Sequence, residues 1–228
     1  MAVQWDNILK QIRFAFARPL HPRGIAWVGV PLLLLVLSIV AGWHGANFWL
    51  FITIVFYVCF RDPARVPPAV DGIGVSPADG ILTAVDRAPW PIEVEQAGET
   101  QRIIISPRFY DVHVLRAPVA SALTYAQQFS GQWGSNIFDK SSAGLERTVA
   151  IFKLPNGQSI AIEVVGGAMA DRVRLNARSG DVVTVGQAIA YAAFGGEVRL
   201  YVPESVTVIS QIGQRMIAGE TPLVALQS

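Results

Sequence analysis

Residues 149–165 read VAIFKLPNGQSIAIEVV, and this stretch gives the clearest indication of the fold class. Two β-rich runs, Val149–Leu154 and Ser159–Val165, lie on either side of the dipeptide Asn156-Gly157. Asn and Gly accept the positive φ values that tight hairpin turns require. The stretch therefore predicts a β-hairpin.

Short β-rich runs of the same kind recur on both sides of this hairpin, separated by Gly, Pro, Asn and Asp. They are Gly80–Val85, Arg102–Ile105, Val182–Val185, Glu197–Val202 and Thr207–Ile209. No long helical pattern intervenes between these runs. The predicted fold class is therefore α+β with a mainly antiparallel β domain, as a sandwich or barrel-sandwich.

Two uncharged runs, Ile25–Val40 and Ala46–Phe60, precede this domain and predict a hydrophobic helical hairpin. Each run is near or below the roughly 20 residues needed to span hydrocarbon, so two short spans and a re-entrant or interfacial hairpin both remain open. A buried hairpin of a soluble core is the alternative. Basic residues flank the pair on both sides, namely Lys10, Arg13, Arg18, Arg23, Arg61 and Arg65. By the positive-inside rule, the C-terminal domain then faces the cytoplasm.

The sequence thus predicts three parts. A basic amphipathic segment covers residues 1–24, a membrane hairpin covers 25–60 and a β-rich domain covers 61–228. Apolar residues recur at roughly helical spacing over residues 4–16, which fits a helix on the membrane surface or an ordinary packing helix.

The composition narrows the classes of function. Of the 228 residues, 52% are hydrophobic and 15% are charged, and the net charge is +1, whereas soluble domains carry roughly 25% charged residues. A nearly neutral chain has no basic field to hold nucleic acid, so no nucleic-acid partner is expected. One cysteine excludes an intrachain disulfide, and three histidines form no Cys/His cluster with metal-ligand spacing, so no metal is expected.

Two segments carry residues suited to chemistry. In Ser76-Pro77-Ala78-Asp79-Gly80, a turn ahead of a strand would hold the carboxylate of Asp79. In Asp111-Val112-His113, an extended backbone would point Asp111 and His113 to the same face, which makes His113 an acid/base candidate oriented by a carboxylate. An ordinary turn and a structural histidine are the alternative interpretations.

Six segments in order resemble the short bacterial form of phosphatidylserine decarboxylase. The first is the hydrophobic hairpin, and the other five are Phe60–Pro67, Ser76–Gly80, Asp111–His113 with Arg116–Val119, Phe138–Ser142 leading to Glu146-Arg147, and Ala193–Gly195. The resemblance covers nearly the whole chain. It implies a protein of the bacterial cytoplasmic membrane that converts phosphatidylserine to phosphatidylethanolamine and CO2.

The resemblance also implies a cofactor and a set of site residues. Family members cut themselves between Gly and Ser, and the serine becomes an N-terminal pyruvoyl group that accepts electrons as CO2 leaves. The residues that assist this cleavage correspond to Asp79 and His113, and the cleavage point corresponds to Gly195 and Gly196. The implied substrate-binding residues are His113, Arg116, Glu146, Arg147 and Arg172.

The chain departs from the family at the cleavage point. The family has Phe-Gly-Ser-Arg where this chain has Phe194-Gly195-Gly196-Glu197, and glycine has no hydroxyl to attack the preceding carbonyl. Three further departures place Leu145 for Asn, Asp171 for Arg and Glu197 for Arg. If these positions line the pocket, the changed charges disfavour an anionic headgroup. The pyruvoyl group is therefore expected to be absent.

Three functions remain open at this point. The first is decarboxylation by a route that the sequence does not reveal. The second, which the missing serine favours, is a non-catalytic membrane relative that binds an aminophospholipid or a partner such as an active paralogue; the family also suggests a homo-oligomer. The third is an adaptor similar to biotinyl or lipoyl domains, because Ser179–Gln187 resembles the turn and strand of these domains. The Met-Lys-Met-like attachment lysine of these domains is absent from the sequence.

Overall fold

The computed structural model of the chain describes residues 20–94, 98–129, 146–154, 156–166, 173–192 and 196–226. The chain divides into two units, Met1–Ala64 and Arg65–Ser228. The amphipathic pattern predicted over residues 4–16, with Lys10, Arg13 and Arg18, lies outside the described residues.

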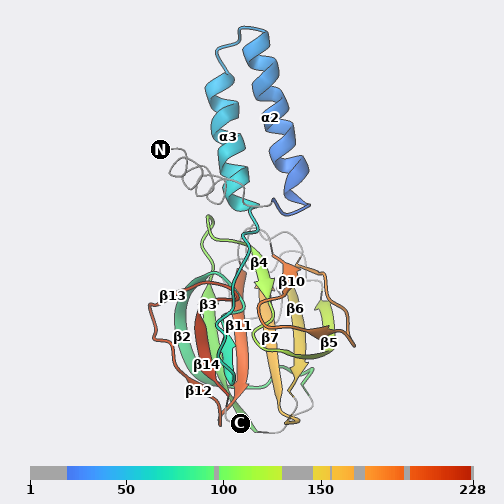
Figure 1. Cartoon of the computed structure of the whole chain (residues 1–228), viewed down its shortest axis with the longest axis vertical. Helices are drawn as coiled ribbons and strands as arrows, with labels where there is room; N and C mark the ends of the chain where they lie inside the picture. The colour runs from blue at the N-terminus through green and yellow to red at the C-terminus, as the bar shows by residue number, and fades with distance from the viewer. Residues whose placement is uncertain are drawn as a thin grey trace, which may run out of the picture. The chain divides into compact units, whose positions relative to one another are not determined.

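The first unit contains helices α2 (Gly24–Val40) and α3 (Ala46–Cys59), which pack side by side (Figure 1). Trp27 contacts Phe56 edge to face, with ring centres 5.4 Å apart. Most other large apolar side chains of the pair are exposed, including Leu33 at 58% and Phe51 at 63%. Among the described residues, no helix is long and apolar enough to cross a membrane. The prediction of a membrane hairpin over 25–60 is therefore not supported by these helices, because 17 and 14 residues fall short of a full span.

The second unit is built almost entirely of antiparallel strands. Its largest sheet has the order β13-β2-β3-β11-β7-β6-β5-β9 and curls into a half-barrel (Figure 1). The strands of this sheet are β2 (Gly80–Pro89), β3 (Glu99–Ser106), β5 (Ser121–Phe129), β6 (Arg147–Lys153), β7 (Ser159–Gly166), β9 (Val182–Val183), β11 (Gly196–Pro203) and β13 (Arg215–Met216).

Two small sheets accompany it. One has the order β4-β10-β8 and the other β1-β14-β12. Their strands are β1 (Ile73–Val75), β4 (Val114–Arg116), β8 (Arg174–Leu175), β10 (Ala188–Tyr191), β12 (Thr207–Val208) and β14 (Pro222–Ala225). The prediction of an α+β fold with mainly antiparallel strands is thus confirmed.

The hairpin predicted from residues 149–165 is also confirmed. Strands β6 and β7 pair antiparallel, with Lys153 opposite Ser159. Gly157 has φ +83°, a value that glycine adopts without strain. The side chain of Asn156 accepts a hydrogen bond from the backbone N–H of Gln158 at 3.0 Å, which closes the turn.

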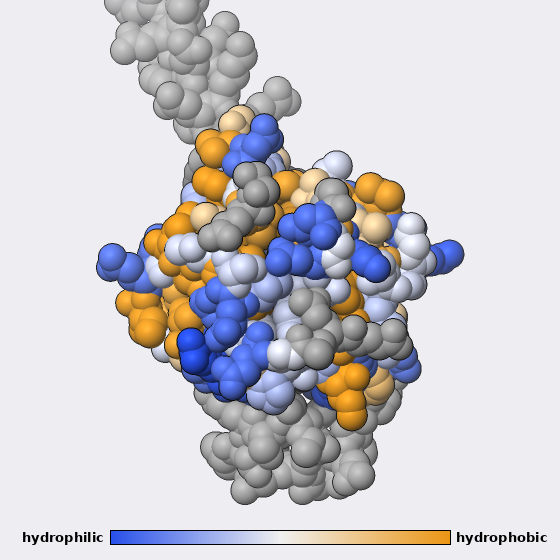
Figure 2. Space-filling model, turned by 90° about the horizontal axis from the view of Figure 1, so that it is seen from below, coloured by the Kyte–Doolittle hydropathy of each residue, from blue (hydrophilic) through white to orange (hydrophobic). Residues whose placement is uncertain are grey.

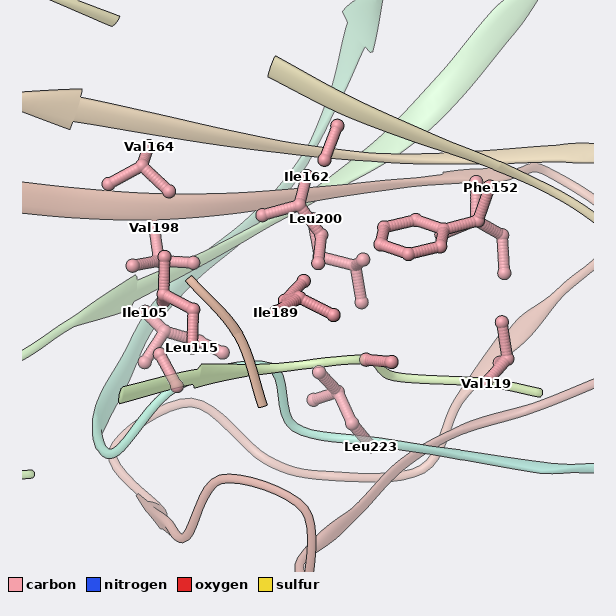
Figure 3. Close-up of a cluster of buried hydrophobic side chains, with 14 of the residues drawn as sticks. Ile105, Leu115, Val119, Phe152, Ile162, Val164, Ile189, Val198, Leu200 and Leu223 are labelled. Carbon is pink, nitrogen blue, oxygen red and sulfur yellow. The ribbon is translucent and has the colours of Figure 1, made fainter. Parts of the chain in front are cut away.

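The main core lies on one face of the large sheet. Every second residue of a strand points to the same face, so Val198, Leu200 and Val202 of β11 enter the core, while Glu197, Arg199 and Tyr201 point to the other face. Figure 3 shows core side chains from the large sheet packed against residues of the small sheets, among them Leu115, Ile189 and Leu223. Three sheets therefore share one hydrophobic core.

The other face of the large sheet carries a smaller apolar cluster with charged residues beside it. The cluster contains Ala88, Val94, Val149, Ile151, Ala161 and Tyr201. Seen from below, hydrophilic residues run across the middle of the β unit, and hydrophobic residues form smaller groups toward its edge (Figure 2).

Candidate functional site

His113 and Gly196 line the same small cavity. Its volume is about 10 Å³, which leaves room for about one water molecule. The other lining residues are Ala78, Pro107, Val112, Leu115, Val164, Ala192 and Val198. The fold thus brings together His113, the predicted cleavage position and the residue next to Asp79. Gly195 and Arg172, two other predicted site residues, lie outside the described residues.

Gly196 opens β11 and lies opposite Gly166 of β7. Its φ is +137°, a backbone conformation that residues with a side chain rarely adopt. A Cβ atom at this position would overlap the carbonyl oxygen of Val165. The overlap is with backbone of a paired strand and not with a movable side chain, so the position suits glycine alone.

His113 is buried, with 4% of its surface exposed. Its Nε2 atom lies 3.2 Å from the carbonyl oxygen of Phe109. A carbonyl oxygen only accepts hydrogen bonds, so Nε2 carries a proton in this contact. A buried imidazole that lines a cavity can act as an acid or base there or hold a polar ligand.

Asp79 is buried at 5% exposure and its carboxylate is held from several directions. Arg65 donates from Nη2 to both carboxylate oxygens, at 3.0 and 2.8 Å, and the backbone N–H of Ala218 donates at 2.7 Å. Burial raises the pKa of Asp79, while Arg65 and the backbone N–H groups of Ala218 and Val112 oppose the rise. The carboxylate of Asp79 therefore links three segments of the chain. They are the segment that contains Arg65, the turn that contains Ala218, and the segment of Val112 that precedes His113.

Asp111 does not lie in an extended segment with His113, contrary to the prediction. Asp111 sits in a bend, and the strand β4 begins only at Val114. Its carboxylate accepts the backbone N–H of Arg108 at 2.9 Å and contacts Nη2 of Arg215 at 2.9 Å. The turn that contains Arg108 and the strand that contains Arg215 thus determine where the Asp111 carboxylate points. The alternation of side chains along an extended strand does not determine it.

Of the predicted substrate-binding residues that the structure describes, His113 lines the cavity, whereas Arg116, Glu146 and Arg147 do not. Residues opposite each other in an antiparallel pair share a face, and Arg147 lies opposite Val165, which in turn lies opposite Glu197. Val164 and Val198, which line the cavity, are next in sequence to Val165 and Glu197. Their side chains therefore lie on the face of the sheet opposite Arg147. Arg147 instead pairs with Glu93 at 2.5 Å and lies 4.5 Å from the centre of the Phe129 ring.

Arg116 and Glu146 also have contacts that explain their positions. Arg116 is buried and donates from Nη1 to the carbonyl oxygen of Gly186 at 2.9 Å. Glu146 accepts a hydrogen bond from the side-chain amide of Gln128. Neither residue lines the cavity of His113.

Glu197 belongs to a network of charges on the face of the sheet opposite the cavity. Arg199 donates from Nε to Glu197 at 2.6 Å and from Nη1 to Glu163 at 3.3 Å. The hydroxyl of Tyr201 donates to Glu163 at 2.8 Å. The changed charge at position 197 is therefore compensated locally and does not enter the cavity. The other two departures, at Leu145 and Asp171, lie outside the described residues.

Sequence reasoning missed the residues that hold Asp79 and Asp111 in place. The sequence places Arg65 in the basic flank of the helices and in the segment Phe60–Pro67 without indicating a partner for it, and it does not single out Arg215. The signal in each case is tertiary, because the partners are 14 and 104 positions away along the chain. Within the described part of the chain, no group of three His, Cys, Asp or Glu residues could hold a metal ion.

The comparisons with known proteins agree on one family. The family model described as phosphatidylserine decarboxylase matches residues 52–224. A relative from Ruegeria pomeroyi, named phosphatidylserine decarboxylase proenzyme, is 33% identical over 222 residues, covering 95% of this chain and 100% of the relative. A protein of the same name from Cereibacter sphaeroides is 33% identical, and the match covers 93% of this chain and 92% of the relative. Another from Nocardia farcinica is 36% identical, and the match covers 91% of this chain and 88% of the relative. No solved structure matches the chain significantly.

Proposed function

The chain belongs to the phosphatidylserine decarboxylase family, and from this premise we propose that it is a member that stays uncut and binds an aminophospholipid without decarboxylating it. The ligand is phosphatidylserine or its amine-bearing relatives, bound at the membrane. The proposal follows the family for the class of ligand and departs from it for the chemistry.

Gly196 carries this proposal. In the family the pyruvoyl group is made from a serine, and the position that corresponds to this serine is occupied here by a residue without a hydroxyl. The backbone conformation of Gly196 and its contact with Val165 leave no space for the Cβ atom that a pyruvoyl precursor needs. The residues present therefore do not fit the cofactor.

The cavity beside Gly196 supports a binding role. His113 lines this cavity, and an imidazole suits the polar headgroup of an aminophospholipid. At about 10 Å³ the cavity admits about one water molecule, so a headgroup enters only if the lining segment of Pro107, Val112 and His113 moves outward.

The membrane partner, the location and the assembly are parts of the same proposal. The exposed apolar side chains of α2 and α3 favour contact with lipid. We place the protein at the bacterial cytoplasmic membrane with the β unit on the cytoplasmic side. Its partners are membrane phospholipid and either a second copy or an active paralogue.

A vesicle-binding assay with the full chain, after removal of the detergent, tests the proposal. We expect binding to vesicles that contain phosphatidylserine to exceed binding to vesicles of phosphatidylcholine with an equal charge of phosphatidylglycerol. The substitution His113→Ala should remove this preference, while His44→Ala, at an exposed histidine outside the cavity, should leave it unchanged. Equal binding to both vesicles would contradict the proposal.

The second candidate is decarboxylation, which the match over nearly the full length and the position of His113 at the cavity favour. Release of labelled CO2 from carboxyl-labelled phosphatidylserine measures it. Because the chain cannot make its own cofactor from Gly196, we expect no release by the purified chain alone. Release that persists after removal of every other protein would favour the second candidate.

A further inference from the structure

A loop beside the cavity carries exposed aromatic side chains. Residues 107–110 connect β3 to the bend at Asp111, and Pro107 lines the cavity together with His113. Phe109 and Tyr110 are 50% and 47% exposed. Covering apolar surface of this kind is favourable. The two rings therefore offer apolar surface to a partner directly next to the candidate site.

Positive charge accompanies the two rings. Arg108 donates from Nη1 to the hydroxyl of Tyr110 at 2.7 Å, and its guanidinium lies 5.9 Å from the centre of that ring. Arg215 reaches the same loop through its contact with Asp111, although 53% of the Arg215 side chain is exposed and the aspartate is buried. Two arginines against one aspartate leave a net positive charge. We call residues 107–110 with Arg215 the aromatic-basic loop.

The chemistry of this loop fits the surface of a bilayer. A tyrosine ring prefers the boundary where one end is apolar and the other is wet, and arginine places its stem along apolar surface while its charge stays in the headgroup layer. The net positive charge complements anionic lipid, whose surface attracts exposed Arg and Lys side chains. A second copy of the chain, with net charge +1, has no overall negative charge to offer.

We propose that the aromatic-basic loop docks on an anionic lipid bilayer and presents the His113 cavity to the headgroup layer. The inference rests on the proposed function in one respect, since a phospholipid ligand lies in a membrane. It adds the surface through which the site meets that membrane. Because Pro107 belongs to the loop and lines the cavity together with Val112 and His113, docking and entry of a headgroup would involve neighbouring residues.

Fluorescence quenching in the full chain tests this docking. The one cysteine is replaced by Cys59→Ala, and Phe109→Cys introduces a site for an environment-sensitive dye. The matched control is Ile92→Cys, because Ile92 is 88% exposed and lies at the other end of the β2–β3 hairpin. In vesicles of phosphatidylcholine and phosphatidylglycerol with nitroxide headgroups, we expect the dye at 109 to lose most of its fluorescence and the dye at 92 to keep it.

Two further variants extend this experiment. Arg108→Gln should reduce the quenching at 109 in anionic vesicles but not in phosphatidylcholine alone, since only the charge attraction is lost. Tyr110→Cys provides a second labelling site if Phe109→Cys fails to fold. Equal quenching at 109 and 92 would overturn the proposal. Shielding at 109 that depends on protein concentration and not on nitroxide lipid would also overturn it, in favour of a second copy.

The docking proposal and the proposed phosphatidylserine ligand can each be contradicted without the other. Quenching at 109 without a preference for phosphatidylserine would overturn the proposed ligand and retain the docking surface. A preference for phosphatidylserine without quenching at 109 would overturn the docking surface and retain the ligand.

Discussion

At the scale of single residues, Gly196 lies where other residue types would be strained. Positive φ costs a residue with a side chain about 1–3 kcal/mol, and the overlap with the backbone of Val165 adds to that cost. Restoring the serine of the family is therefore a structural change as well as a chemical one.

We predict that Gly196→Ser lowers the thermal transition of the β unit and leaves the chain uncut. The control is Gly98→Ser, because Gly98 has a similar φ of +108° but no atom within 4 Å of an added Cβ. The difference between the two transitions isolates the overlap with Val165. Calorimetry measures both transitions, and a Gly196→Ser chain as stable as the wild type would contradict the described backbone.

Arg65 and Asp79 form the other informative contact at this scale. Their side chains are 11% and 7% exposed, so removal of Arg65 leaves the buried carboxylate of Asp79 without its positively charged partner. Breaking such a pair costs roughly 3–5 kcal/mol. Arg65→Met alone should therefore destabilise the β unit strongly.

A double-mutant cycle checks that contact. Asp79→Asn together with Arg65→Met should cost clearly less than the sum of the two single changes, because the double variant buries no lone charge. Denaturation midpoints of the two single variants and the double variant, each compared with the wild type, give the three changes in stability. Additive effects would show that Arg65 does not hold Asp79.

At the scale of elements, the network on β7 and β11 responds to alkaline pH. Burial, with the nearby Glu163, raises the pKa of Tyr201 from 10 to about 12. A group with a raised pKa in the folded chain stabilises it below the unfolded pKa, and this stabilisation is lost as the pH rises through the folded value. The folded chain should therefore lose stability between pH 10 and about 12.

Tyr201→Phe tests this pH dependence. The variant should be less stable than the wild type at pH 7, since Glu163 loses a donor. Between pH 10 and 12 the gap should narrow by up to about 2 kcal/mol. Chemical denaturation at several pH values measures the gap, and a constant gap would indicate that Tyr201 does not titrate in that range.

The elements also show how much the sequence could predict. The β6–β7 hairpin was predictable because its signals are local, namely two β-rich runs and an Asn-Gly turn. Strand β5 was missed because a bulge between Leu123 and Tyr125 breaks the alternation that identifies a strand. The two-residue strand β13 was missed because only its pairing with Ile81 of β2 defines it.

The same reasoning applies to the candidate site. The sequence named His113 and Gly196, and the fold brings both to one cavity. It also named Arg147, which lies on the other face of the sheet, because the face depends on the register of β6 against β7 and not on residue type. The partner of Asp79 could not be inferred, since the 14-residue separation to Arg65 carries no local signal.

At the scale of the whole molecule, the chain contains an apolar helical unit and a β unit, and we propose that it stays uncut. Cleavage ahead of β11 would separate this strand from the preceding strands of the large sheet along the sequence. The described geometry of Gly196 and the absence of a hydroxyl there both favour the uncut chain.

The intact mass of the chain purified from membranes in mild detergent tests this central claim most directly. We predict a single species at 24.7 kDa. Two species, with a C-terminal piece of roughly 3.5 kDa by average residue mass and a blocked, carbonyl-reactive N-terminus, would contradict the claim and would show that self-processing occurs without a serine at position 196.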